Sequence, residues 1–265
     1  MVVKVKNTAA RHGLRRALRS AIVRAGREDQ ARTTLRRLRE ARAPFNEALR
    51  RELLDDRAIQ LILATVLRAD SNVIDVGAHE GAVLDSVLRV APLGRHIAFE
   101  PIPELHELLV GRYPGVDVRR AALFDANGDA TFTHVLDRPA VSGLRLRKDI
   151  TSGGEALREI TVSTERLDDV LAADYVPALI KIDVEGAELA VMRGALNTLQ
   201  RHRPFVLFEH GLGGADLYEA RSEEVFDVLE SAGLRIFDLD GDGPYSRALF
   251  TDTFTRPIWN FLAAP

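Results

Sequence analysis

The chain contains no cysteine and no long apolar run. The lack of cysteine excludes disulfides, thiolate zinc sites and cysteine nucleophiles, and it is compatible with a cytoplasmic protein. The longest apolar stretch, residues 61–67, is seven residues long and includes Thr65, so no membrane-spanning segment is expected. The first thirty residues are rich in arginine and have no apolar centre, which does not fit a secretory signal. We therefore expect a cytoplasmic protein.

Two signatures of nicotinamide enzymes are also missing. The sequence has no Gly-x-Gly-x-x-Gly motif, which lets the backbone approach a pyrophosphate, and no Tyr-x-x-x-Lys proton relay. A nicotinamide-dinucleotide enzyme therefore remains only an alternative. With 265 residues, the chain is long enough for one α/β domain with an extension.

Residues 72–81, Asn-Val-Ile-Asp-Val-Gly-Ala-His-Glu-Gly, have the pattern of a strand followed by a glycine turn. Their β-branched apolar residues are typical of a strand buried on both faces, and residues 82–90 are helix-like. Gly77 permits a turn with positive φ, and Gly81 is expected to let the helix approach the sheet. The free N–H groups of that helix would then face a ligand above the turn.

Acidic residues in and near this turn distinguish between two cofactors. Asp75 and Glu80 would repel a pyrophosphate, whereas they suit the ammonium and sulfonium groups of S-adenosylmethionine. His79 is expected to shape the turn or contact the methionine end, and Asp75 could instead bind backbone amides. A second apolar run, residues 96–99, ends in Glu100, whose position suits the two hydroxyls of a ribose.

Four stretches together resemble the FkbM-type methyltransferase family over residues 72–265. They are Val-Ile-Asp-Val-Gly-Ala-His-Glu-Gly (73–81), Phe-Glu-Pro (99–101), Ile-Lys-Ile-Asp-Val-Glu-Gly-Ala-Glu (180–188) and Leu-Phe-Glu-His (207–210). The resemblance implies transfer of a methyl group from S-adenosylmethionine to hydroxyl oxygens, often on sugars or polyketides. We therefore expect an O-methyltransferase acting on a small molecule, sugar or glycan. A non-catalytic binding or scaffold protein of the same fold is a further alternative.

The chain from residue 58 onward alternates apolar strand-like runs with helical runs. This alternation predicts right-handed crossovers and a mainly parallel sheet. Together with the resemblance, it predicts the Rossmann-like class I methyltransferase fold, with a seven-stranded sheet, helices on both faces and an antiparallel last strand. The further expected strands are residues 116–119, 179–184, 205–208, 235–239 and 259–263.

Residues 1–57 are predicted to form a basic helical extension, separate from the methyltransferase domain of residues 58–265. The extension holds 16 lysines and arginines against 7 acidic residues, whereas the remainder holds 20 against 32. Residues 14–25 fit an amphipathic helix, and residues 31–43 fit a second helix. The extension could pack on its own domain or a sister subunit, or bind an anionic membrane surface. Basic residues alone do not supply the aromatic stacking platforms of RNA-binding surfaces, so no nucleic acid is expected.

The alternation of strand-like and helical runs is interrupted between residues 121 and 162. Residues 125–128 form a turn signal before the alternating residues 130–135, which predicts a hairpin. The polar, glycine-containing residues 136–159 are expected to form a loop that carries acceptor specificity. We include Ala122 and Asp125, which follow the third strand, among the candidate cofactor-binding residues.

The candidate catalytic residues follow two later strands. They are Asp183, Glu185, Glu209 and His210. Transfer to oxygen requires a group that accepts the hydroxyl proton, and His210 is the expected acceptor, with Asp183 positioning the donor or acceptor and Glu209 assisting. Two or three of these groups could instead hold a divalent cation such as magnesium. Glu188 could be an ordinary helix residue that faces solvent or an arginine.

Overall fold

The computed structural model describes residues 47–136, 138–145 and 156–265. The chain divides into two units, Met1–Arg57 and Ala58–Pro265. The helices expected at residues 14–25 and 31–43 lie outside the described residues. Helix α3 (Glu47–Val66) starts in the first unit and continues into the second. Within the described ranges, no helix combines the length and the apolar character needed to cross a membrane.

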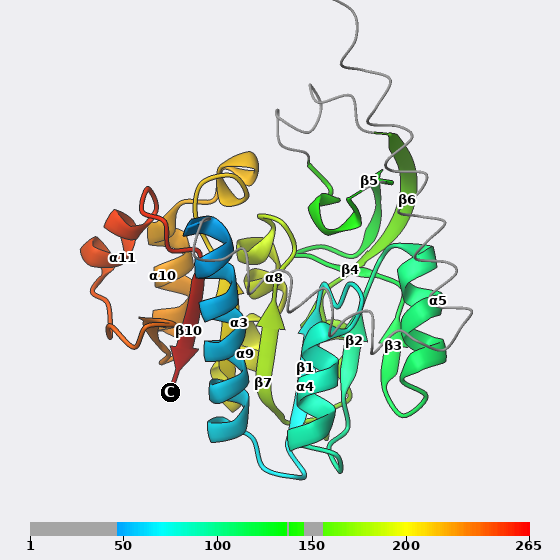
Figure 1. Cartoon of the computed structure of the whole chain (residues 1–265), viewed down its shortest axis with the longest axis horizontal. Helices are drawn as coiled ribbons and strands as arrows, with labels where there is room; N and C mark the ends of the chain where they lie inside the picture. Colours follow the sequence, from blue (N-terminus) through cyan, green and yellow to red (C-terminus); the bar gives the residue numbers. More distant parts are fainter. Residues whose placement is uncertain (1–46, 137, 146–155) are drawn as a thin grey trace, which may run out of the picture. The chain divides into compact units, whose positions relative to one another are not determined.

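A seven-stranded sheet organises the second unit (Figure 1). In spatial order the strands are β3 (Asp117–Arg119), β2 (Ile97–Phe99), β1 (Asn72–Val76), β7 (Pro177–Ile182), β8 (Phe205–Glu209), β10 (Asn260–Ala264) and β9 (Arg235–Asp238). Parallel pairing joins β1 to β2 and β7, β2 to β3, and β7 to β8, whereas β10 is antiparallel to both β8 and β9. The mainly parallel sheet with an antiparallel last strand is therefore confirmed.

Helices cover both faces of this sheet, as expected (Figure 1). Successive strand residues point to opposite faces, so Ile74 and Val76 belong to one apolar cluster and Val73 to another. The face that bears Val73 packs against α3 from Ala58 onward and α4 (Ala82–Val90), with α5 (Pro103–Arg112) beside them. The opposite face packs against α7 (Leu167–Val170), α8 (Glu188–Gly194), α9 (Leu196–His202), α10 (Ser222–Ser231) and α11 (Arg247–Thr253).

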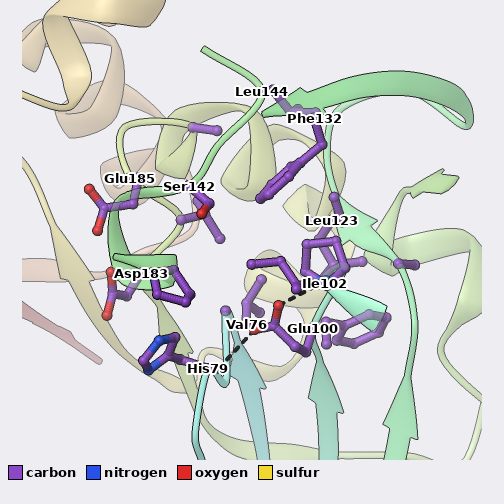
Figure 2. Close-up of a pocket in the computed structure, with 18 of the residues that line it drawn as sticks. Val76, His79, Glu100, Ile102, Leu123, Phe132, Ser142, Leu144, Asp183 and Glu185 are labelled. Atoms are coloured by element: carbon purple, nitrogen blue, oxygen red, sulfur yellow. Dashed lines mark hydrogen bonds between the residues drawn. The ribbon is translucent and has the colours of Figure 1, made fainter. Parts of the chain in front are cut away.

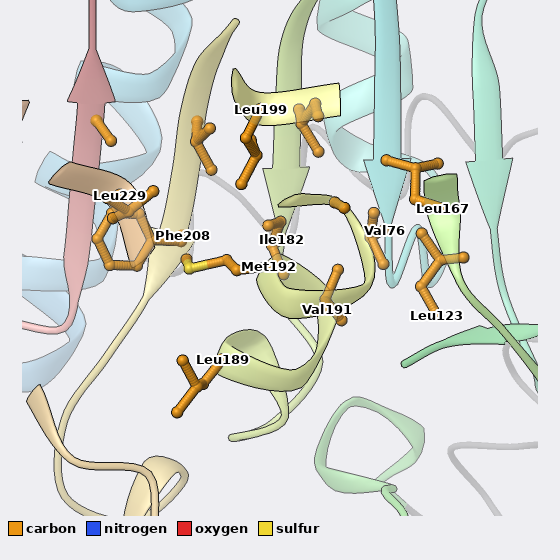
Figure 3. Packing of buried hydrophobic residues seen from close by; sticks show 14 of the residues in the cluster. Val76, Leu123, Leu167, Ile182, Leu189, Val191, Met192, Leu199, Phe208 and Leu229 are labelled. Carbon is orange, nitrogen blue, oxygen red and sulfur yellow. The ribbon is translucent and has the colours of Figure 1, made fainter. Parts of the chain in front are cut away.

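The larger core lies on the second face (Figure 3). Val76, Ile182 and Phe208, each near the carboxyl end of its strand, are at most 3% exposed. Met192 and Leu229 pack in the same cluster from α8 and α10. Each such side chain contributes about 1.5–3 kcal/mol on burial. The strand ends that carry the expected site are thus fixed by the core beneath them.

A smaller sheet, absent from the sequence-based prediction, lies beside the large one. It consists of β4 (Ala122–Leu123), β6 (Leu157–Glu165) and β5 (Gly128–Val135), with β6 in the middle. The turn at residues 125–128 therefore joins two strands that both pair with β6 rather than with each other, which corrects the expected hairpin. The expected loop at 136–159 contains the short helix η2 (Pro139–Val141) and the start of β6, and residues 146–155 lie outside the described ranges.

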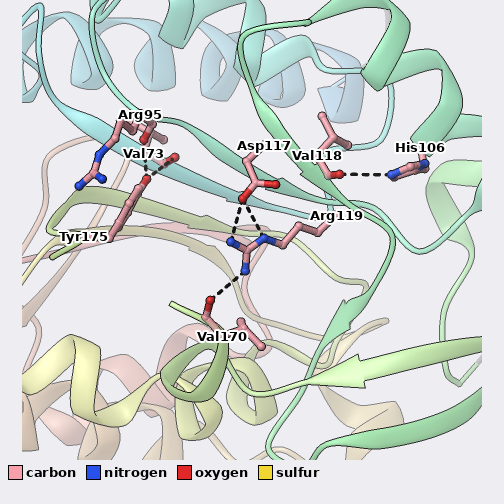
Figure 4. A network of polar contacts seen from close by, with 8 residues as sticks. All are labelled: Val73, Arg95, His106, Asp117, Val118, Arg119, Val170 and Tyr175. Atoms are coloured by element: carbon pink, nitrogen blue, oxygen red, sulfur yellow. Dashed lines mark hydrogen bonds and ion pairs between the residues drawn. The ribbon is translucent and has the colours of Figure 1, made fainter. Parts of the chain in front are cut away.

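Polar contacts hold the edge strand β3 and the segments that precede β2 and β7 (Figure 4). The guanidinium of Arg119 donates to the Asp117 carboxylate at 2.7 Å and to the Val170 carbonyl at 3.0 Å, which ties β3 to α7. The hydroxyl of Tyr175 donates to the Arg95 carbonyl at 2.7 Å and so links the segments that precede β7 and β2.

Candidate functional site

A pocket opens at the carboxyl ends of β1, β2 and β7, where the small sheet faces the large one (Figure 2). Open α/β sheets bind ligands at this edge. The large sheet contributes the residues that follow its strands, and the small sheet and η2 contribute an apolar wall. The lining is Val76, Gly77, His79, Phe99–Ile102, Ala121–Leu123, Phe132, Pro139, Ala140, Ser142, Leu144, Asp183–Glu185, Ala187 and Tyr218.

The turn after β1 needs glycine at two positions. Gly77 has φ +76°, and a Cβ there would lie 2.0 Å from the carbonyl oxygen of Asp183. Gly81 has φ +81°, and a Cβ there would lie 2.4 Å from the ring of Tyr113. Gly77 lines the pocket, whereas Gly81 makes room for Tyr113, whose hydroxyl donates to the Gly81 carbonyl at 2.9 Å. The expected reason for Gly81, a close approach of α4 to the sheet, is replaced by this contact.

Glu100 connects the tip of β2 to the turn after β1. Its Oε2 accepts the N–H of His79 at 2.8 Å and its Oε1 accepts the N–H of Ile102 at 2.9 Å. The side chain is buried and lines the pocket, and burial raises the pKa of Glu100 to about 7. Each carboxylate oxygen has a second lone pair, so the pair of oxygens can also accept two ligand hydroxyls.

Asp75 lies below the pocket and does not line it. It is 1% exposed, and its Oδ1 is 3.3 Å from the ammonium of Lys181 in β7. The same ammonium lies 3.3 Å from Oδ2 of Asp183 and donates to the Gly77 carbonyl at 2.8 Å. Burial alone would lower the pKa of Lys181, but the two carboxylates raise it above its ordinary value. Lys181 is missing from the sequence-based site, although a lysine within an apolar strand is a readable signal.

The tip of β7 supplies two carboxylates to the pocket. Asp183 has a side chain that is 39% exposed, and Glu185 has the unusual φ of +56°. Both lie on the same side of the pocket in Figure 2. Behind them, Oε1 of buried Glu188 accepts the N–H groups of Val184 at 3.0 Å and Gly186 at 3.1 Å. The alternative in which Glu188 faces solvent or an arginine is excluded, because its carboxylate binds the backbone before α8. Burial raises the pKa of Glu188 to about 7.

Glu209, at the tip of β8, lies behind the acids of β7. The nearby charge of Asp183, together with burial and the charges of Glu188 and Glu185, raises the pKa of Glu209 well above its usual range. Glu209 does not line the pocket. It belongs to the electrostatic surroundings of Asp183.

His210 is turned away from the pocket. Its ring is 3% exposed, stacks on Phe250 at 5.3 Å between centroids, and lies 5.2 Å from the ring of Phe254. Its Nε2 is 2.8 Å from Oγ of Ser222. Burial lowers the pKa of His210 to about 4. The pKa of His210 thus lies below its ordinary value, and its buried placement outside the pocket lining does not support the expected role of proton acceptor.

Of the two candidate cofactor-binding residues that follow the third strand, only one reaches the pocket. Ala122 lines the pocket, whereas Asp125 is exposed and does not. The apolar wall near Ala122 was not expected and includes Ile102, Leu123 and Phe132. An apolar wall beside Glu100 suits an aromatic ring.

The acids of the pocket do not form a recognisable metal site. Across the described ranges, no group of three or more histidine, cysteine, aspartate or glutamate side chains is arranged to hold a metal ion. The described part of the chain therefore offers no such cluster of ligands for the divalent cation considered as an alternative.

Comparisons with known proteins identify relatives of this chain. The family model described as the methyltransferase FkbM domain matches residues 75–236. The 2-O-methyltransferase NoeI of Sinorhizobium fredii is 26% identical over 211 residues, which cover 74% of this chain and 84% of NoeI. The AMB antimetabolite synthetase AmbE of Pseudomonas aeruginosa is 29% identical over 209 residues, or 64% of this chain. The chain spans about 10% of the length of AmbE.

Among solved structures, a methyltransferase FkbM from Methylobacillus flagellatus is 16% identical, with a TM-score of 0.47. The similarity covers 74% of this chain and 44% of that one. The match to the family model confirms the resemblance that the four sequence stretches predicted.

Proposed function

The chain belongs to the FkbM methyltransferase family, and we propose that this S-adenosylmethionine-dependent enzyme methylates a hydroxyl oxygen of a small molecule, sugar or glycan. Membership of a methyltransferase family favours this function over the alternative of a nicotinamide-dinucleotide enzyme. The relative NoeI is named as a 2-O-methyltransferase and is matched over 84% of its length, which supports oxygen as the acceptor atom.

The pocket residues fit S-adenosylmethionine. Glu100 offers two carboxylate oxygens to the ribose hydroxyls, in addition to its backbone contacts with the neighbouring turn. Ile102 and Leu123 offer apolar surface to the adenine ring. The carboxylates of Asp183 and Glu185 complement the positive charges of the methionine end.

The observation that carries the proposal is the pair of carboxylates at the tip of β7, both of which line the pocket. S-adenosylmethionine supplies a methyl group on a good leaving group. The protein must orient the acceptor hydroxyl and remove its proton. We assign proton acceptance to Asp183, whose carboxylate is partly exposed and held by Lys181. Glu185 then contributes to orientation of the hydroxyl.

The charges of the pocket favour an acceptor without negative charge. Its described lining includes the acids Glu100, Asp183 and Glu185, and no lysine or arginine is among the described lining residues. A phosphate or carboxylate group would meet repulsion there. Neutral hydroxyl compounds such as sugars fit these charges better.

The test is methyl transfer from labelled S-adenosylmethionine to a panel of neutral glycans and polyketide alcohols, with amines and thiols included. We expect label in at least one hydroxyl compound and a strong loss of label with Asp183→Asn. Label only in amines or thiols would overturn the O-methyltransferase proposal. A folded protein that binds S-adenosylhomocysteine but labels no acceptor would favour the scaffold alternative.

For the basic segment, residues 1–57, we propose contact with a sister subunit or an anionic membrane surface, based on its surplus of positive charge. Salt-sensitive co-sedimentation with phosphatidylserine vesicles would support the membrane surface. Concentration-dependent dimerisation without vesicle binding would support the sister subunit. Loss of either behaviour in a chain that starts at Pro44 would assign it to residues 1–43.

A further inference from the structure

We propose that Lys181 is a positioning residue that joins the glycine turn after β1 to the tip of β7 and so sets the surface that meets the methionine end of the cofactor. Lys181 itself does not line the pocket, and only 11% of its side chain is exposed. Its effect on the ligand would pass through Gly77 and Asp183, which both line the pocket.

Four oxygen atoms surround the ammonium of Lys181. Two belong to the end of β1 and its turn, namely the Gly77 carbonyl at 2.8 Å and the Val76 carbonyl at 3.4 Å. The other two are carboxylate oxygens of Asp75 and Asp183, each at 3.3 Å. The ammonium therefore connects two neighbouring strand ends at the place where both reach the pocket.

The backbone adds a second link between the same two segments. The N–H of Asp183 donates to the Val76 carbonyl at 3.2 Å, and the Asp183 carbonyl packs where a Cβ of Gly77 would otherwise lie. Gly77 and Asp183 are thus in close contact without a side chain between them. A small movement of either segment changes the shape of the pocket floor, and Lys181 resists such a movement from below.

The alternative to a positioning role for Lys181 is a purely structural one. Within the described residues, Lys181 is the only ion-pair partner of buried Asp75, so it could serve merely to neutralise that carboxylate. Replacing both members of a buried ion pair with neutral groups often restores stability. A neutralised pair would still lack the ammonium that binds the Gly77 carbonyl and the Asp183 carboxylate.

The test compares Lys181→Met with the double variant Asp75→Asn/Lys181→Met. Thermal unfolding measures stability, and calorimetry measures the affinity of the folded proteins for S-adenosylhomocysteine. We expect Lys181→Met to lower the midpoint of unfolding and the double variant to recover most of it. We expect both variants to bind S-adenosylhomocysteine about tenfold more weakly or worse, as for the loss of one hydrogen bond from a charged group. Should Lys181→Met not fold, the double variant carries the test.

Asp238→Asn provides a matched control. Asp238 is also buried, and it accepts the N–H groups of Asp240 and Asp242 at the far edge strand β9. This variant should lose stability but keep the affinity for S-adenosylhomocysteine. A double variant with wild-type affinity would overturn the positioning role, as would an equal loss of affinity in Asp238→Asn. The readout needs no acceptor, so it is independent of the proposed hydroxyl substrate.

Discussion

The carboxylate of Glu100 holds the N–H of His79 at 2.8 Å, which joins the end of β2 to the turn after β1. His79 has φ +50°, a backbone conformation that a non-glycine residue seldom adopts. The same carboxylate lines the pocket. Glu100 therefore shapes the site before any ligand arrives, and its ionisation can control ligand binding.

Ligand affinity should depend on pH through Glu100. Its pKa is about 7, above the ordinary 4.5, because the side chain is buried. The ionised carboxylate accepts hydrogen bonds from ribose hydroxyls, so affinity for S-adenosylhomocysteine should rise as pH increases. Calorimetry should show an increase of up to about tenfold between about pH 6 and pH 8.

Glu100→Gln is the matched variant for that measurement. Its amide can accept one backbone N–H but presents an NH₂ group to the other. Binding should weaken by about tenfold or more at pH 8 and become nearly independent of pH. Unchanged affinity in the folded variant would remove Glu100 from the ribose site.

Two glycine substitutions should have opposite effects on stability. Gly77→Ala places a methyl group against the Asp183 carbonyl at a positive φ, so it should destabilise the protein by more than about 1 kcal/mol. Gly111 lies near the end of α5 with no atom within 4 Å of an added Cβ. Gly111→Ala should stabilise the protein by up to about 1 kcal/mol. Urea denaturation measures both, and equal effects would contradict the described turn.

His210 should matter for stability rather than for proton transfer. Its pKa is about 4 in the folded chain, compared with an ordinary 6.5, so the unfolded chain binds the proton first as pH falls. His210 therefore contributes stability that is present above about pH 6.5 and is lost as the pH falls to about 4.

His210→Phe should remove this pH-dependent part while keeping an aromatic ring beside Phe250 and Phe254. Denaturation curves at several pH values for the variant and the wild type would isolate the difference. The turnover number of the variant should stay within a few-fold of the wild type. A hundredfold loss in a stable His210→Phe protein would restore His210 as a catalytic candidate.

Substitutions of the two acids at the tip of β7 should affect different kinetic constants. Asp183→Asn removes the proposed proton acceptor and should lower kcat by about a hundredfold or more. Glu185→Gln removes an orienting group and should mainly raise KM for the acceptor. Equal kcat values for Asp183→Asn and the wild type would rule out Asp183 as the acceptor of the proton.

The large sheet could be predicted because its signals are local. The apolar runs that became β1, β7 and β8 end in acidic or glycine residues, and the alternation of strands and helices implies their parallel order. The small sheet could not be predicted in the same way. Its β6 pairs with both β4 and β5 across a long connection, and such pairing depends on contacts between residues far apart in the sequence.

The candidate site was predictable only to the level of strand ends. Glu100, Asp183 and Glu185 reach the pocket, whereas Glu209 and His210, at a neighbouring strand end, do not line it. Position at a strand end does not decide which way a side chain turns. The ring of His210 packs in the core against Phe250 of α11 and Phe254, which follows that helix.

The most direct measurement is the position of the methyl group in the product. The enzyme would be incubated with S-adenosylmethionine that carries a ¹³C-labelled methyl group and with a neutral hydroxyl acceptor from the panel. A carbon–proton correlation spectrum then distinguishes a methoxy group from methyl on nitrogen, sulfur or carbon. We predict a methoxy product with the wild type and its loss with Asp183→Asn. Label on any atom other than oxygen, or an unchanged methoxy yield with Asp183→Asn, would contradict the proposed function and site.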